Sequence, residues 1–272
     1  SFLSRESKYS LLARRMIDAL MMILTKILAS VEAHVSQIVK LRLYVLHHLS
    51  LHSGLPRGTI LFTVALFSGL PLGVLFRMIQ GGDRGGSWFQ RKALLSLLSG
   101  TMISLITFGK TTVHAFYLSL PSLCLLKLTS SKADGSKTKS ERRKRIGVGF
   151  VTFLWSFGYL VYIHYSADSG GEWKRGNIDI TGLLMVLCLK TTSCAMNFED
   201  YELKDEEKSS FMKEHELSEA PKTLEYLAWC MFPCTLVSGP TLEFKTFRMW
   251  LREEGIFDPN SPRNKLTHYA RG

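Results

Sequence analysis

The chain has 272 residues, and its 34 Lys and Arg against 23 Asp and Glu give a formal net charge of +11. The basic residues flank apolar blocks without zinc-finger spacing, an RNP-like motif or a long basic helix, which argues against nucleic acid as a partner and favours an anionic lipid surface. Because long apolar blocks alternate with charged ones, the sequence predicts an all-α, polytopic membrane protein.

Residues 1–52 form a cationic, periodic arm. Apolar residues recur at steps of three and four from Leu12 to Ile38, which is typical of one or two amphipathic helices. Such an arm could lie in the membrane interface or pack against a partner subunit, and both remain open. His47, His48 and His52 follow at helical spacing, but no carboxylate joins them, so we interpret them as a solvated helix face and predict no metal site.

Residues 53–250 form the predicted membrane domain, and residues 251–272 a polar tail. Five apolar spans are expected in the domain, at 59–79, 93–108, 112–128, 146–165 and 177–197. Two polar segments interrupt them, a basic linker at 130–145 and a charged loop at 198–222. The loops after the first and third spans are the basic ones, which places both on the cytoplasmic or matrix-like side.

A sixth, broken element is expected at 225–250. Its apolar run is shorter than the roughly 20 residues of a spanning helix, contains Pro233 and ends in Ser238-Gly239-Pro240. Prolines leave backbone polar groups unpaired, and at membrane depth this is tolerated only where the backbone is buried in protein or lines a cavity. The sequence therefore predicts about six spanning or re-entrant helices around an internal chamber.

One face of the fifth span is polar. Lys190 lies deep in the span, and an ionisable side chain there normally faces a cavity or a partner. Ser193 and Asn197 follow at steps of three and four on the same face. We expect Lys190, Thr192, Ser193 and Asn197 to line a polar passage inside the bundle, with snorkelling of Lys190 toward the interface as the alternative.

Two blocks, ITGLLMVLCLKTTSCAMNFEDYE and LEYLAWCMFPCTLVSGPTLEFKTFRMW, resemble the membrane-bound O-acyltransferase family, and its lysophospholipid acyltransferase branch in particular. The pattern is M-V-L-x-x-K-x-T-S, a proline, an [ST]-G-P turn and an aromatic tail. The matching residues are Met185, Val186, Leu187, Lys190, Thr192, Ser193, Pro221, Ser238, Gly239, Pro240, Phe244, Phe247 and Trp250. The resemblance covers only the front half of the family's fold.

The resemblance implies a helical membrane fold whose chamber receives acyl-CoA and an acyl acceptor. In the family, a histidine in a Trp-His context is the general base, which suits imidazole near neutral pH, and an asparagine in a Trp-Asn context positions substrate. In this sequence the five tryptophans precede Phe89, Ser156, Lys174, Cys230 and Leu251. We therefore predict no catalytic residue in this chain.

Two functions are compatible with this pattern. The favoured hypothesis is a non-catalytic, structural and lipid-binding subunit of a larger membrane complex, with phospholipids and other membrane subunits as partners. The alternative is the N-terminal half of an active or split lysophospholipid O-acyltransferase. We predict no cofactor, and only in this second case is acyl-CoA a cosubstrate. Lys190, Ser193, Asn197 and the loop of Ser238, Gly239 and Pro240 then line the lipid passage.

A small transporter is a third, weaker possibility, because we see no inverted repeats. The sequence is also compatible with two cellular compartments. The resemblance implies the endoplasmic reticulum, whereas an accessory role fits an organellar, mitochondrial inner membrane.

Overall fold

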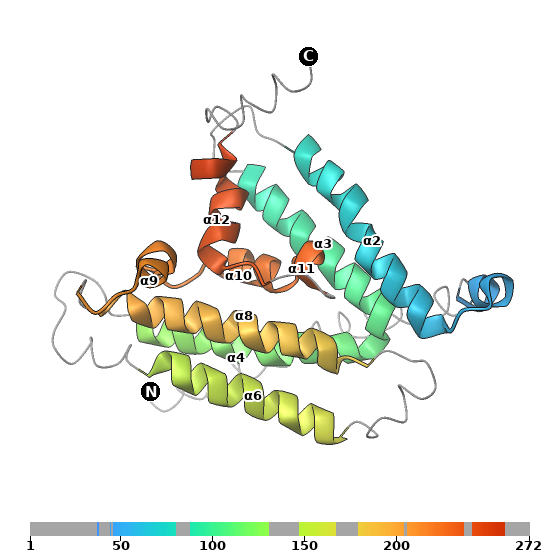
Figure 1. Cartoon of the computed structure of the whole chain (residues 1–272), viewed down its shortest axis with the longest axis horizontal. Helices are drawn as coiled ribbons and strands as arrows, with labels where there is room; N and C mark the ends of the chain where they lie inside the picture. The colour runs from blue at the N-terminus through green and yellow to red at the C-terminus, as the bar shows by residue number, and fades with distance from the viewer. Residues whose placement is uncertain are drawn as a thin grey trace, which may run out of the picture.

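A computed structural model of the chain describes residues 37, 44, 46–79, 88–130, 147–166, 179–203, 206–236 and 241–258. Every regular element within these ranges is a helix (Figure 1). The long ones are α2 (Arg57–Met78), α3 (Trp88–Phe108), α4 (Val113–Ser130), α6 (Val148–Ser166) and α8 (Thr181–Asp200). This confirms the predicted all-α class.

Four of the described helical segments are long and apolar enough to cross a membrane. One of them, Trp88–Ser130, contains both α3 and α4, which the short 3₁₀ turn η1 (Gly109–Thr112) joins. The five predicted spans thus correspond to five helices, and the protein is an integral membrane protein. Pro71 lies inside α2 without ending it.

Several predicted segments lie outside the described residues. These are most of the arm at 1–52, the basic linker apart from Ser130, the Ser238–Pro240 turn, and the tail beyond residue 258. The described residues of the arm, 37, 44 and 46–52, are helical.

The helices form two groups. α4, α6 and α8 lie side by side, and α2 and α3 form a second pair that crosses them (Figure 1). Small and hydroxyl-bearing residues let the first group pack closely, as is usual between membrane helices. The Ser156 hydroxyl lies 3.0 Å from that of Thr191, which joins α6 to α8. A Cβ atom at Gly149 would come within 2.9 Å of Met196, so glycine allows the close approach of the two helices at this point.

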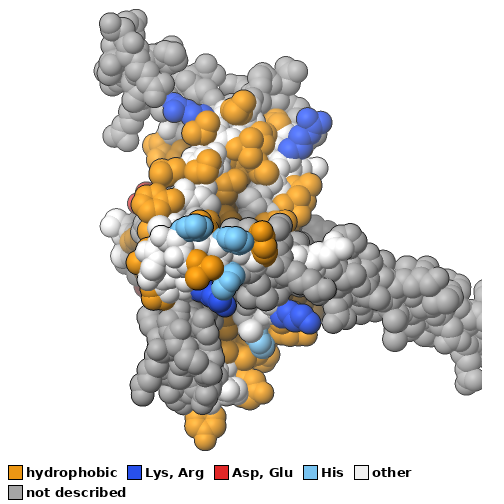
Figure 2. Space-filling model, turned by 90° about the vertical axis from the view of Figure 1, so that its right-hand side faces the viewer, with side chains coloured by type: hydrophobic (Ala, Val, Ile, Leu, Met, Phe, Trp, Pro, Cys, Tyr) orange, Lys and Arg blue, Asp and Glu red, His pale blue; other side chains and the backbone are white. Residues whose placement is uncertain are grey.

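The outer surfaces of the bundle are apolar. Figure 2 shows one face of the molecule on which hydrophobic side chains gather. Large apolar side chains that are more than half exposed occur on several helices, among them Phe67 and Leu70 on α2 and Phe150 and Tyr162 on α6. Exposed apolar surface on this scale is unusual for a soluble monomer and is expected where helices contact lipid.

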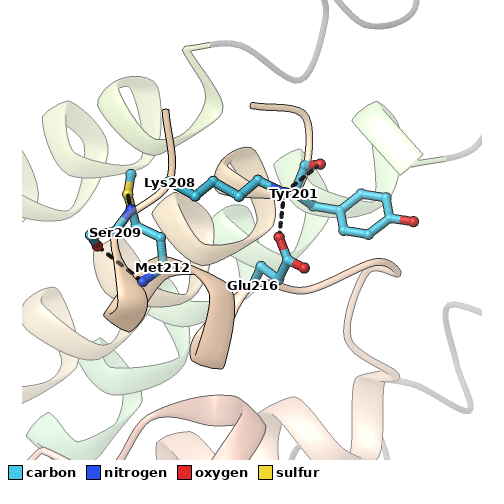
Figure 3. Close-up of polar contacts among 5 residues, drawn as sticks. All are labelled: Tyr201, Lys208, Ser209, Met212 and Glu216. Carbon is cyan, nitrogen blue, oxygen red and sulfur yellow. Dashed lines mark hydrogen bonds and ion pairs between the residues drawn. The ribbon is translucent and has the colours of Figure 1, made fainter. Parts of the chain in front are cut away.

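The charged loop predicted at 198–222 contains a short helix, α9 (Ser210–His215). Its first turn is capped by Ser209, whose hydroxyl accepts from the backbone N–H of Met212 (Figure 3). Lys208 pairs with Glu216 at 2.6 Å and donates to the carbonyl of Tyr201, which folds the segment back toward the end of α8.

Candidate functional site

The broken element predicted at 225–250 is a chain of short helices, of which α10 and α11 lie between α3 and α8 and α12 lies at the edge of the bundle (Figure 1). It comprises α10 (Thr223–Cys230), α11 (Pro233–Leu236) and α12 (Phe244–Arg252), with Pro233 starting α11. Tyr226, Trp229 and Phe244 are 0–1% exposed. The interrupted backbone is therefore buried in protein, which is the condition for irregular backbone at membrane depth.

α10 approaches α3 closely. A Cβ atom at Gly100 would lie 1.6 Å from the carbonyl oxygen of Met231, so a side chain at this position cannot fit. One turn earlier, the Ser96 hydroxyl donates to the carbonyl of Ala228 at 2.9 Å. α3 thus holds the last turn of α10 by direct backbone contact and by one hydrogen bond.

Lys190 holds the same turn from the opposite side. Its side chain is 1% exposed, and its ammonium donates to the carbonyl of Trp229 at 2.8 Å and to the hydroxyl of Thr235 at 2.7 Å. The last carbonyls of a helix lack intrahelical partners and carry its negative dipole end, so a cation there is favourable. Lys190 is a buried cation held by the end of α10.

Glu243, at the start of α12, is bound by the same face of α8. One of its carboxylate oxygens, Oε2, accepts from the Ser193 hydroxyl at 2.6 Å and from the Asn197 amide at 2.7 Å. Hydrogen bonds to an ionised group are stronger than neutral ones. Lys190 and Glu243 therefore fix the two ends of the 229–243 segment to one helix face.

Further polar contacts close the rest of this unit. The indole N–H of Trp229 donates to the carbonyl of Leu242 at 2.7 Å. Arg252, at the end of α12, pairs at 2.9 Å with Glu225, which is 3% exposed in the first turn of α10. We call α8 together with the described residues 223–236 and 241–252 the anchored unit.

Comparison with known proteins assigns this unit to a family. Residues 166–268, which include the anchored unit, match the membrane-bound O-acyltransferase family. Lysophospholipid acyltransferase 1 of Arabidopsis thaliana is 34% identical over 179 residues, 66% of this chain and 36% of the relative. Lysophospholipid acyltransferase 2 of the same plant is 30% identical over 217 residues, 80% of this chain and 42% of the relative.

The chain belongs to the membrane-bound O-acyltransferase family. The lysophospholipid acyltransferase of Saccharomyces cerevisiae is 32% identical over a shorter stretch of 124 residues, 44% of this chain and 20% of the relative. This chain spans well under half the length of each of these acyltransferases.

The acyltransferase fold brings three of the predicted site residues together. Lys190, Ser193 and Asn197 all point from α8 toward residues 229–243. Thr192 is 9% exposed and shares none of these hydrogen bonds. Ser238, Gly239 and Pro240 lie outside the described residues. That these residues line a passage for lipid stays a prediction.

Sequence reasoning did not identify Glu243 as a site residue. A signal was available, because the amide and hydroxyl donors at Asn197 and Ser193 share a face of a membrane helix and need an acceptor. Glu243 is the acid at the start of the aromatic tail, but nothing local indicates that it pairs with residues about 50 positions earlier.

None of the described histidines is hydrogen-bonded to a residue of the anchored unit. His114, at the start of α4, lies 2.7 Å from the hydroxyl of Tyr159 on α6. In the part of the chain that the structure describes, no group of three or more His, Cys, Asp or Glu side chains is placed to hold a metal ion.

Proposed function

We propose that this chain supplies the lipid-binding, membrane-embedded part of a lysophospholipid O-acyltransferase. The observation that carries the proposal is the anchored unit, which lies in the family-matched region and uses the family-like residues Lys190 and Ser193 for buried contacts. Buried polar contacts of this kind hold irregular backbone in one arrangement inside a membrane protein. Such an arrangement suits the wall of a chamber.

The reaction would join an acyl group from acyl-CoA to the free hydroxyl of a lysophospholipid. The relatives' names indicate this acceptor class. The hydroxyl must lose its proton as it attacks the thioester carbon and the CoA thiolate leaves, so a general base is required. None of the eight histidines of this chain follows a tryptophan. We infer that the base comes from a part of the enzyme outside these 272 residues.

A second candidate is a non-catalytic lipid-binding subunit. It is favoured by the anchored unit itself, in which Lys190, Glu243 and Asn197 are each occupied by protein partners. A scaffold needs these contacts as much as an enzyme does. The two candidates differ in whether added catalytic residues restore acyl transfer.

Complementation distinguishes them. The chain is expressed in membranes that lack lysophospholipid acyltransferase activity, alone or together with the C-terminal part of Arabidopsis lysophospholipid acyltransferase 1 that it does not cover. Labelled oleoyl-CoA and several lysophospholipids are then supplied. We expect no transfer by either part alone and transfer by the pair. Failure of the pair, although both parts are inserted and associated, would favour the non-catalytic subunit.

For the compartment, we propose the endoplasmic reticulum, which the family resemblance implies, over an organellar inner membrane. Fractionation of cells that express the tagged chain, with markers for both membranes, tests this. Recovery of the chain with the mitochondrial inner-membrane marker would contradict it.

A further inference from the structure

A cavity of about 350 Å³ lies on the side of α10–α12 that faces α2, away from the contacts of α8. Its lining comes from α2, from α3, from residues at the start of α11, and from α12 and the residues after it. It includes Gly73, Phe76, Arg77, Phe232, Cys234 and Trp250. Aromatic rings form much of this wall, with the rings of Phe76 and Trp250 5.3 Å apart. A cavity of this size and lining is typical of a site for a small amphiphilic molecule.

The cavity exists because α2 carries glycine where it meets α11. A Cβ atom at Gly69 would already touch Cys234 at 3.9 Å, so the helices are in contact there. One turn later, a Cβ atom at Gly73 would meet nothing within 4 Å. The space beside Gly73 is thus left open by the sequence and could be filled by a larger side chain without displacing backbone.

The cavity carries one unneutralised positive charge among the described residues. Lys92 lines it but is paired with Glu253 at 3.5 Å and donates to the carbonyl of Trp250 at 3.2 Å. Arg77, in the last turn of α2, is exposed and has no carboxylate within ion-pair distance in the described part of the chain. A guanidinium of this kind recognises phosphate well.

An apolar row leads from the cavity along α2. Phe62, Leu66 and Leu70 are 37–70% exposed, and they continue through Gly73 to Arg77 at steps of three and four. Residues at these steps lie on one helix face. From Arg77 to Leu66 the helix rises about 16 Å, close to the roughly 15 Å depth of one hydrocarbon leaflet. The row therefore matches an acyl chain whose headgroup sits at Arg77.

We propose that this cavity binds the headgroup of a glycerophospholipid, with Arg77 pairing its phosphate and an acyl chain lying along the α2 row. The end of α2 is where the basic loop after the first span begins, so the lipid belongs to the cytoplasmic or matrix-like leaflet. The site is separate from the contacts of α8 and requires no acyl transfer. The lipid-binding test can therefore fail while the proposed acyltransferase function stands. Equally, the complementation test can fail while this lipid site is present.

Alkylation of Cys234 by N-ethylmaleimide reports occupancy, because Cys234 is exposed and lines the cavity. Cys124, an exposed thiol on α4, is the internal reference. The purified full chain in detergent is mixed with phosphatidylglycerol, diacylglycerol with the same acyl chains, inorganic phosphate or palmitoyl-CoA. The alkylation rates of Cys234 and Cys124 are then measured by mass spectrometry. At a lipid concentration about ten times its Kd, phosphatidylglycerol should slow alkylation of Cys234 about tenfold and leave Cys124 unchanged.

Matched variants test the two parts of the proposal. Arg77→Gln should abolish protection and Arg77→Lys should keep it, while Arg91→Gln, a change at an exposed arginine of α3 outside the lining, should have no effect. Gly73→Leu should fill the cavity and make the rate at Cys234 insensitive to lipid. Gly158→Leu on α6 is the matched control, because a Cβ atom there also meets nothing within 4 Å.

Four results would overturn the proposal. Equal protection by diacylglycerol, or full protection of the Arg77→Gln variant, would show that phosphate is not recognised. Protection by inorganic phosphate alone would mean that the apolar row contributes nothing. Protection by palmitoyl-CoA but not by phosphatidylglycerol would assign the cavity to a nucleotide-bearing thioester and not to a phospholipid.

Discussion

At the scale of single residues, the chain stabilises a lysine inside a membrane helix with neutral acceptors. The ammonium of Lys190 meets the carbonyls of Trp229 and Cys230 and the hydroxyl of Thr235. These acceptors lie at the end of α10 and in the short α11. The position of α10 therefore decides whether this lysine can be buried.

Replacement of Lys190 tests this dependence. Lys190→Ala removes the donor and leaves a cavity, so we expect the free energy of unfolding to fall by about 2–4 kcal/mol. Lys190→Met keeps most of the volume and should cost less, about 1–2 kcal/mol for carbonyls left without their donor. Thermal unfolding in detergent should rank wild type above Lys190→Met and Lys190→Ala last. Equal stability of all three would indicate that Lys190 snorkels to the interface.

The pair of Asn197 and Glu243 is the second residue-scale prediction. We expect Asn197→Ala and Glu243→Ala to be non-additive, with a coupling energy of about 1–3 kcal/mol, because each removes the same charge-assisted hydrogen bond. The measurement is a double-mutant cycle on unfolding. Tyr165, which is 87% exposed on α6, provides the control cycle with Asn197, and it should be additive. Additivity of the Asn197 and Glu243 changes would contradict the contact.

At the scale of elements, the central feature is the passage of α10 between α3 and α8. Gly100 sets how closely α3 approaches, since the carbonyl of Met231 occupies the space of a Cβ atom. Gly100→Ala must push the helices apart and should destabilise the protein by about 2 kcal/mol or more. Gly158→Ala is the matched change, and it should be neutral or stabilise by up to about 1 kcal/mol through helix propensity.

Both glycine variants can be compared by melting temperature in one detergent. If the Gly100→Ala protein has the same melting temperature as the wild type, α3 and α10 are not in backbone contact.

The sequence predicted the long helices well because hydropathy is a local property. The span predicted at 93–108 nevertheless begins earlier, at Trp88. The charge of Lys92 placed the predicted start of the apolar span after it, at residue 93. In the structure this charge is paired with Glu253, and the ammonium lies 4.1 Å from the ring centre of Trp250. Neither partner is near it in sequence. Helix limits set by tertiary partners are not visible in hydropathy.

The end of α8 shows the same limit. The predicted span stops at Asn197, whereas the helix continues to Asp200. Glu199 in this extra turn accepts from the backbone N–H groups of Gly147 and Gly149 at the start of α6. The family resemblance included Lys190 and Ser193 on α8, whose side chains contact residues 229–243. It did not identify their contacts, which depend on the fold as a whole.

At the scale of the whole molecule, the membrane helices bury α10 and α11 between them and present apolar surfaces outward. This is the architecture that a membrane chamber needs, since irregular backbone is shielded from lipid. The chain spans 36–42% of the two plant acyltransferases it resembles. On our account, it contributes one wall of the reaction chamber, and the general base belongs to another part.

Acyl transfer by complemented membranes tests this account most directly. With the C-terminal part of the plant relative present, Glu243→Ala should lower kcat/KM for the lysophospholipid about tenfold or more, because a misplaced chamber wall loses at least about 1.4 kcal/mol of transition-state stabilisation. Tyr165→Ala should leave the rate within about twofold of wild type, as expected for an exposed position. A Glu243→Ala chain that is folded, associated and fully active would contradict the claim that the anchored unit forms part of the acyltransferase site.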